Sequence, residues 1–270
     1  MHINELPIGV FDSGLGGLTG VRQLRKILPH EDIVYFGDTG RVPYGTKSTD
    51  TLVKYVKQDI SFLESFNIKF IIIACGTASC AVLPNIQNEI STDIIGVLKP
   101  TCRKAAAITK NNKVGVIGTQ STINSGNYTK IIKELAPQTE VISRACPMFV
   151  PLVENGYTSG EIARLLIEEY LEPIKEKGVD TLILGCTHYP HLADEIQKYM
   201  GSGVTLINSG AEAAAEAKNR LLSQSALSDK KRGTVKYYVS DSVDGFEKLA
   251  GMFLGKHING SVEKIDIDKY

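Results

Sequence analysis

The chain has 270 residues, of which 43% are hydrophobic and 22% charged, with 30 Lys plus Arg against 30 Asp plus Glu. These proportions exclude disordered, collagenous and disulfide-scaffold proteins, and the length favours about two domains. The zero net charge gives no electrostatic reason to expect nucleic acid or a membrane as partner. The apolar runs fall below the ~18–20 residues that span a bilayer, and the N-terminal residues resemble no signal peptide, so we expect a cytoplasmic protein with reduced cysteines.

Short apolar segments alternate with amphipathic ones in the first third of the chain. Apolar positions at helical spacing, such as Leu52, Val56 and Ile60, predict helices, and β-branched runs predict strands. Strands are expected at 8–11, 33–36 and 70–74, and helices at 18–28, 51–66 and 78–90. This alternation is typical of an α/β fold with a doubly wound parallel sheet and helices on both faces.

The same pattern restarts in the middle of the chain. Residues 114–119 resemble 8–13, and residues 182–187 resemble 71–77, in the same order and at similar offsets. In the second pair, each strand ends in a cysteine with a threonine close behind. We therefore predict two pseudo-symmetric doubly wound parallel-sheet domains with the active site in the cleft between them.

The C-terminal tail resembles neither half closely. A polar stretch at 223–233 precedes a predicted strand at 235–240 and a predicted helix at 241–254. We expect this tail to return to the first half. The expected domains are therefore 1–98 plus 208–270, and 99–207.

Residues that could carry chemistry follow the predicted strands. In open α/β sheets, ligands bind beyond the carboxyl ends of the strands. The positions that meet this condition are Asp12, Ser13, Asp38, Cys75, Gly76, Thr77, Thr119 to Thr122, Cys186, Thr187 and His188.

Cys75 and Cys186 are the main candidates among the five cysteines. Each is expected where a strand ends and a helix begins, and a helix N-terminus lowers a thiol pKa. Their matched positions in the two halves argue for function. Cys80, Cys102 and Cys146 are interpreted as small buried side chains.

Two thiols that face each other across a cleft suit inversion of a stereocentre. One group removes a proton from one face of a carbon, and the other returns a proton from the opposite face. Because the reaction runs both ways, the two groups should be alike and in opposite protonation states.

Neighbouring polar residues could assist the thiols. His188 could control the protonation state of Cys186 or act as an acid beside it. Asp12 could act as a base behind the thiols or bind a substrate ammonium group. Hydroxyl groups near helix N-termini could hold a carboxylate; they belong to Ser13, Thr77, Thr119, Thr122 and Thr187.

The residues alone leave other functions open for this site. The glycine-rich segment 14–17 does not meet dinucleotide-loop spacing. Cys186, His188 and His191 lack an evident fourth zinc ligand, so no metal site is predicted. A cysteine-dependent hydrolase would use Cys186 with His188 but would leave Cys75 unexplained. A ligand-binding module without catalysis is a further alternative.

Several blocks in order resemble one known family over essentially the whole length. The chain resembles the glutamate racemases, in the cofactor-independent aspartate/glutamate racemase superfamily. The residues that carry the resemblance are 8–17, 37–39, 42–45, 73–75, 77–79, 149–154, 183–190 and 207–210.

The resemblance implies interconversion of L- and D-glutamate without a cofactor, with D-glutamate feeding peptidoglycan synthesis. It implies Cys75 and Cys186 as acid/base thiols, assisted by Asp12, Glu154 and His188. It also implies two α/β domains with the site between them, and a homodimer. The implied substrate-lining residues are Asp12, Ser13, Tyr44, Gly45, Gly76, Thr77, Thr187 and His188. A racemase of another acidic amino acid, such as aspartate, is the nearest alternative.

One departure from the family pattern concerns the residue after the first thiol. The family has Asn where this chain has Gly76. Loss of one hydrogen bond typically costs ~0.5–1.5 kcal/mol. We therefore expect weaker substrate binding or an altered rate, and we expect Gly76→Asn to lower KM.

Overall fold

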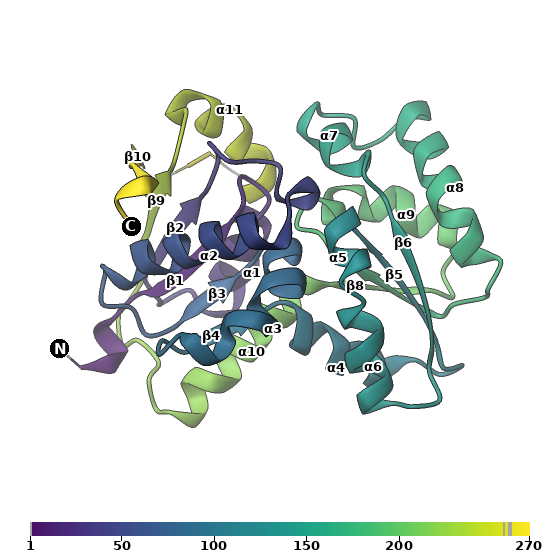
Figure 1. Cartoon of the computed structure of the whole chain (residues 1–270), viewed down its shortest axis with the longest axis horizontal. Coiled ribbons are helices and arrows are strands. Elements are labelled where there is room, and N and C mark those ends of the chain that lie inside the picture. Colours follow the sequence, from purple (N-terminus) through teal and green to yellow (C-terminus); the bar gives the residue numbers. More distant parts are fainter. Residues whose placement is uncertain (1, 256, 259–260) are drawn as a thin grey trace.

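Two parallel β-sheets organise the molecule, whose computed structural model describes residues 2–255, 257–258 and 261–270 (Figure 1). The six-stranded sheet has the order β10-β9-β2-β1-β3-β4, and the four-stranded sheet has the order β6-β5-β7-β8. The first sheet contains β1 (Ile8–Asp12), β2 (Ile33–Gly37), β3 (Ile71–Ile73), β4 (Ile94–Gly96), β9 (Val235–Val239) and β10 (Val262–Lys264). The second contains β5 (Lys113–Gly118), β6 (Glu140–Ala145), β7 (Thr181–Leu184) and β8 (Thr205–Asn208).

Helices connect the strands and cover the sheets. In the N-terminal part they are α1 (Leu18–Ile27), α2 (Thr49–Glu64), α3 (Leu83–Ile86) and α4 (Leu98–Ile108). The second sheet carries α5 (Gln120–Asn124), α6 (Asn127–Leu135), α7 (Phe149–Glu154), α8 (Glu161–Lys175) and α9 (Ala193–Met200). The last two are α10 (Ser209–Ser223) and α11 (Val243–Leu254). None of the helices in the described part of the chain is both long and apolar enough to cross a bilayer.

Both faces of the first sheet are buried. Neighbouring residues of β1 point to opposite faces, so that Val10 belongs to one apolar cluster and Phe11 to another. The Phe11 cluster includes Leu52 and Val56 of α2, and the Val10 cluster includes Leu18 of α1. The predicted α/β fold, a parallel sheet with helices on both faces, is therefore confirmed.

The two sheets repeat one topology. In the first, β1 lies between β2 and β3, with β4 outside β3; in the second, β5 lies between β6 and β7, with β8 outside β7. The strand pairs that resemble each other in sequence, β1 with β5 and β3 with β7, occupy equivalent places. The predicted pseudo-symmetry is thus visible in the strand order.

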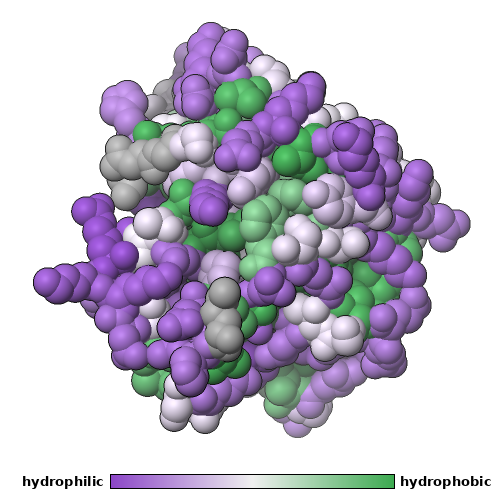
Figure 2. All heavy atoms as spheres, turned by 90° about the vertical axis from the view of Figure 1, so that its left-hand side faces the viewer, coloured by the Kyte–Doolittle hydropathy of each residue, from purple (hydrophilic) through white to green (hydrophobic). Residues whose placement is uncertain are grey.

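The C-terminal tail returns to the first sheet, as expected. Strand β9 pairs with β2, and β10 pairs with the outer side of β9. The edge strand β10 exposes Glu263 and Lys264, and charged side chains on an edge discourage pairing with another chain. Figure 2 shows this side of the molecule, where hydrophilic side chains dominate and hydrophobic ones form only small patches.

The prediction of one continuous helix at 78–90 is wrong. The segment divides into a π-helical turn (Ala78–Val82), α3 and a 3-10 turn (Gln87–Glu89). Pro84 has no N–H to donate, which interrupts the helical ladder. The carbonyl of Cys80, four residues before Pro84, instead accepts a 2.8 Å hydrogen bond from the side chain of Asn127 in α6.

Candidate active site

A cavity of about 380 Å³ lies between the two domains, at the carboxyl ends of the strands. The loops after β1, β2 and β3 form one side, and the loops after β5, β6 and β7 form the other. Its lining residues are Ser13, Gly14, Val42, Pro43, Tyr44, Gly45, Thr46, Cys75, Gly76, Thr77, Thr119, Gln120, Pro147, Val150, Pro151, Glu154, Cys186, Thr187, His188 and Tyr189.

Both candidate thiols line this cavity, one from each domain. Cys75 follows β3 and is 4% exposed, and Cys186 follows β7 and is 7% exposed. The sulfur of Cys75 lies 3.7 Å from the Ser13 hydroxyl and 3.5 Å from the backbone nitrogen of Ala78. Because the two strands occupy equivalent places in their sheets, the two sulfurs approach the cavity from related positions.

The surroundings of Cys75 favour the neutral thiol, contrary to our expectation. Burial and the nearby Asp12 carboxyl raise the pKa of Cys75 to about 12, although the N–H of Ala78 acts in the opposite direction. The helix N-terminus alone would lower this pKa, but desolvation is the larger effect here.

The side chain of His188 lies between Cys186 and Glu154. The ring of His188 places Nδ1 3.9 Å from the Cys186 sulfur and Nε2 3.0 Å from Glu154 Oε1. Burial alone would lower the pKa of His188, but the hydrogen bonds to Cys186 and Glu154 raise it to about 10. A protonated His188 would place its positive charge beside Cys186 and Glu154.

Asp12 lies behind the cavity wall rather than in it, which corrects its expected place among the substrate-lining residues. Its carboxyl is fully buried, accepts a 3.0 Å hydrogen bond from the N–H of Gly14 and lies 3.5 Å from the Thr187 hydroxyl. Burial raises the pKa of Asp12, and the charge of His188 partly offsets that effect. Asp12 therefore contacts the cavity only indirectly, through the lining residues Gly14 and Thr187.

Thr122 is also absent from the lining. It is buried in the first turn of α5, where its N–H donates to the Thr119 hydroxyl, the N-cap of that helix. Thr119 itself does line the cavity, and its hydroxyl is 2.9 Å from that of Thr77 in the other domain. A second bridge joins the domains where the Ser121 hydroxyl donates to the carbonyl of Gly45 at 2.8 Å.

The backbone at Gly76 touches the opposite domain. A Cβ atom added there would lie 2.1 Å from the carbonyl oxygen of Gly185, the residue before Cys186. An asparagine at this position therefore needs the two thiol-bearing loops to move apart. Our expectation that Gly76→Asn simply restores a substrate contact is at odds with this arrangement.

Sequence reasoning missed much of the apolar wall. The lining residues that it did not select as site residues are Gly14, Val42, Pro43, Thr46, Pro147, Val150, Pro151 and Tyr189. Most of them are glycine or apolar, and such loop residues occur throughout a protein, so their types carry little chemical signal. For most of them the signal was membership of the blocks that carry the family resemblance, as Val42 and Pro43 belong to 42–45. Glu154 was found by resemblance alone.

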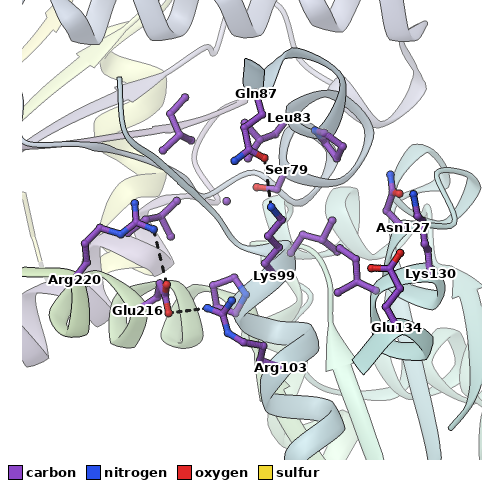
Figure 3. Close-up of a pocket in the computed structure, with 17 residues that line it drawn as sticks. Ser79, Leu83, Gln87, Lys99, Arg103, Asn127, Lys130, Glu134, Glu216 and Arg220 are labelled. Carbon is purple, nitrogen blue, oxygen red and sulfur yellow. Dashed lines mark hydrogen bonds and ion pairs between the residues drawn. The ribbon is translucent and has the colours of Figure 1, made fainter. Parts of the chain in front are cut away.

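A second cavity of about 330 Å³ lies elsewhere between the domains (Figure 3). Polar side chains from α4, α6 and α10 surround it. Glu216 of α10 pairs with Arg103 of α4 at 2.7 Å and with Arg220, one helical turn onward, at 3.9 Å. No cysteine lines this cavity, so the paired thiols distinguish the first one.

No group of three or more His, Cys, Asp or Glu side chains that could hold a metal ion occurs within the described residues. His191, considered above as a zinc ligand with Cys186 and His188, instead packs edge-on against Phe253, with ring centroids 4.6 Å apart.

Comparisons with known proteins agree with this geometry. The family model for Asp/Glu/Hydantoin racemase matches residues 21–217. A glutamate racemase from Geobacter metallireducens is 45% identical over 97% of this chain and 97% of its own length. The structure of glutamate racemase from Francisella tularensis in complex with D-glutamate has a TM-score of 0.92 at 39% identity, covering 99% of this chain and 100% of that one. The structure of glutamate racemase isoform RacE1 from Bacillus anthracis has a TM-score of 0.93 at 38% identity, covering 97% of this chain and 99% of that one.

The paired α/β domains and the family match define an amino-acid racemase fold, and the chain belongs to the Asp/Glu/hydantoin racemase family. Within that family, the relatives compared above are all glutamate racemases. The resemblance inferred from the sequence motifs is confirmed.

Proposed function

We propose that the protein interconverts L- and D-glutamate by proton transfer between two cysteines. The observation that carries the proposal is that Cys75 and Cys186, from equivalent strand ends of two related domains, line one cavity. The names of the relatives support glutamate as the substrate.

In the proposed reaction, a thiolate removes the proton from the α-carbon of glutamate. The electron pair of the broken C–H bond moves into the α-carboxylate, and the opposite thiol donates its proton to the other face of the carbon. The surroundings supply the required asymmetry, because an imidazolium stands beside Cys186 while burial keeps Cys75 protonated. Transfer in the reverse direction exchanges the two roles.

The cavity would hold the substrate through neutral donors. Among the residues that the structure describes, no Lys or Arg lines the cavity, and the lining instead offers the hydroxyls of Ser13, Thr77, Thr119 and Thr187. Fixed hydroxyl and N–H dipoles in a site that excludes water can stabilise both the carboxylates and the charge that develops in the transition state.

The wider role follows from the same proposal. The enzyme would act in the cytoplasm without a cofactor and supply D-glutamate for peptidoglycan. We further propose domain bounds of 1–98 plus 208–270 and 99–207, and a homodimer in solution. Analytical ultracentrifugation tests the homodimer.

Proton NMR of glutamate in D₂O with the purified protein tests the function. We expect the α-proton signal of either enantiomer to disappear as deuterium is incorporated, and the optical rotation to fall to zero. Aspartate in a parallel sample is the control. Exchange of aspartate but not glutamate would assign a different substrate, and binding without exchange would exclude racemisation.

A further inference from the structure

One wall of the cavity is a loop, residues 42–46, that we call the wall loop. Five of its residues line the cavity, yet its own side chains include no charge. The loop is held from behind by a buried polar cluster that the proposed reaction does not use. This anchor cluster consists of Asp38 after β2, Arg41, Tyr44 within the loop, and Asp59 in α2.

Tyr44 is the link between the loop and the cluster. Its ring is 1% exposed, and its hydroxyl lies 2.5 Å from Asp38 Oδ2 and 2.9 Å from Asp59 Oδ2. Arg41 bridges the same two carboxyl groups, with Nε 2.6 Å from Asp38 Oδ2 and Nη2 2.8 Å from Asp59 Oδ1. Both aspartates are fully buried.

The single hydroxyl hydrogen of Tyr44 cannot form hydrogen bonds with both Asp38 and Asp59. A tyrosine hydroxyl carries one hydrogen, which can point to only one acceptor. The shorter contact assigns it to Asp38. The 2.9 Å contact between Tyr44 and Asp59 then joins two oxygens without a hydrogen, unless Asp59 Oδ2 carries one and donates it to Tyr44.

The charge balance leads to the same assignment. One guanidinium faces two carboxyl groups, so the buried cluster is neutral only when one carboxyl is protonated. Asp38 is the better carboxylate, because its other oxygen accepts a 2.8 Å hydrogen bond from the Ser240 hydroxyl. Burial and the neighbouring Asp38 raise the pKa of Asp59 well above its usual value.

Outer contacts keep Arg41 in place. Its Nη1 donates to Gln58 Oε1 at 2.6 Å, and its guanidinium lies 4.2 Å from the centre of the Tyr55 ring. Gln58, Tyr55 and Asp59 all belong to α2, while Ser240 follows β9. The cluster thus ties the wall loop to a helix and to the returning C-terminal segment.

We propose that Asp59 is a neutral carboxylic acid that donates its proton to the Tyr44 hydroxyl, and that the anchor cluster positions the wall loop for substrate binding. The positional role rests on the proposed function, since the loop borders the cavity assigned to glutamate. Asp59, Asp38 and Arg41 do not touch the cavity, so they are positioning residues rather than catalytic ones.

A matched pair of amide substitutions tests the assignment. In Asp59→Asn, the amide group can donate to Tyr44 while its oxygen accepts from Arg41, so KM and kcat should stay within about twofold of the unsubstituted protein. Asp38→Asn removes the carboxylate that faces Arg41, Tyr44 and Ser240, and a lost charged hydrogen bond corresponds to about a tenfold rise in KM. We expect kcat to fall less, because both thiols lie on other loops.

Two further variants complete the design. Tyr44→Phe should raise KM like Asp38→Asn, and Asp50→Asn, an exposed position on α2, should change nothing. Thermal unfolding checks that each variant is folded. If Asp38→Asn does not fold, the comparison of Asp59→Asn with Tyr44→Phe remains decisive.

Carboxyl ¹³C NMR reads the proton on Asp59 without any assay of activity. We expect the Asp59 signal to keep the shift of a protonated acid at pH 7. An ionised Asp59, or an Asp59→Asn variant that raises KM as much as Asp38→Asn, would overturn the proposal. If the unsubstituted protein does not exchange glutamate, the proposed function fails, whereas the NMR result still decides the proton assignment.

Discussion

The two thiols have different electrostatic surroundings despite their equivalent positions. Burial and the nearby Asp12 raise the pKa of Cys75, whereas the Cys186 sulfur lies 3.9 Å from Nδ1 of His188, a side chain whose pKa is raised to about 10. A reaction that needs one base and one acid at any moment benefits from this difference. The pseudo-symmetry of the fold therefore gives the two thiols equivalent positions, and their neighbours Asp12 and His188 give them different electrostatic surroundings.

Replacing either thiol should remove one of the two groups proposed to transfer the proton. We expect Cys75→Ser and Cys186→Ser each to lower the racemisation rate by about 10²–10⁴-fold, the usual contribution of a positioned acid or base. Polarimetry from both enantiomers measures the effect, and Cys102→Ala, at a buried cysteine outside the cavity, is the control. A serine variant with full activity in both directions would exclude that cysteine from the mechanism.

Gly76 permits close approach of the two thiol-bearing loops. Because a Cβ would collide with the backbone of Gly185, we expect Gly76→Ala to lower kcat by about 10–100-fold through separation of the reacting groups. Gly76→Asn should do no better. Gly203→Ala is the matched control, since a Cβ there meets nothing within 4 Å. Unchanged kcat in Gly76→Ala would show that the loops can separate without loss.

His188 should link stability to pH. Its pKa is raised from 6.5 to about 10, so its stabilising effect is complete below pH 6.5 and is lost as the pH rises toward 10. We expect Tm to fall over this range more steeply in the unsubstituted protein than in His188→Asn. Differential scanning calorimetry at several pH values measures the two curves. Parallel curves would show that folding does not raise the pKa of His188.

At the residue scale, the sequence could reveal Cys75 and Cys186 because a cysteine followed by a threonine recurs after matching strands. The sequence contains a weaker signal of the anchor cluster. Asp59 does interrupt the apolar side of α2, one residue before Ile60, and a charged residue at a buried helical position is a usable signal. Its partners Asp38 and Arg41 come from another loop, and only the fold brings them together.

Among the elements, the interrupted helix after Cys75 shows how one residue redirects a contact. Pro84 cannot donate a hydrogen bond, and Asn127 from the second domain donates to the Cys80 carbonyl instead. The periodicity of 78–90 correctly predicted a helical segment at this place, but it did not predict that the segment is interrupted. A local pattern contains no information on which distant side chain will satisfy a freed carbonyl.

Removing this contact should weaken the junction between the domains. In Asn127→Asp the side chain cannot donate, so the buried Cys80 carbonyl loses its partner, at a cost of about 1–3 kcal/mol. Urea unfolding measures the loss. Asn88→Asp, an exposed position nearby, is the control. Equal stability of the two variants would show that water replaces the Asn127 amide.

For the whole molecule, the sequence predicted two related halves and a returning tail because strand patterns and their order are local properties. It could not predict the second cavity, which depends on how α4, α6 and α10 meet. The apolar wall of the first cavity was only partly indicated, through the blocks at 42–45 and 149–154, because loops of both domains form it. Packing between elements distant in sequence sets both features.

A ligand held by both domains should stabilise them together. At a glutamate concentration of about 100 times Kd, the expected gain is about 2.7 kcal/mol. We expect a single thermal transition that moves upward as a whole. Calorimetry with and without glutamate tests this, with D-alanine as a smaller control. A shift of only one of two resolved transitions would place the ligand on one domain.

The position of β9 between β2 and β10 has a consequence during translation. The second sheet is built from one continuous stretch of chain, so it can form while the ribosome is still adding residues. The first sheet stays incomplete until residues 235–239 have left the exit tunnel. A nascent chain therefore completes its first sheet only at the end of its synthesis, when β9 pairs with β2 and β10 pairs with β9.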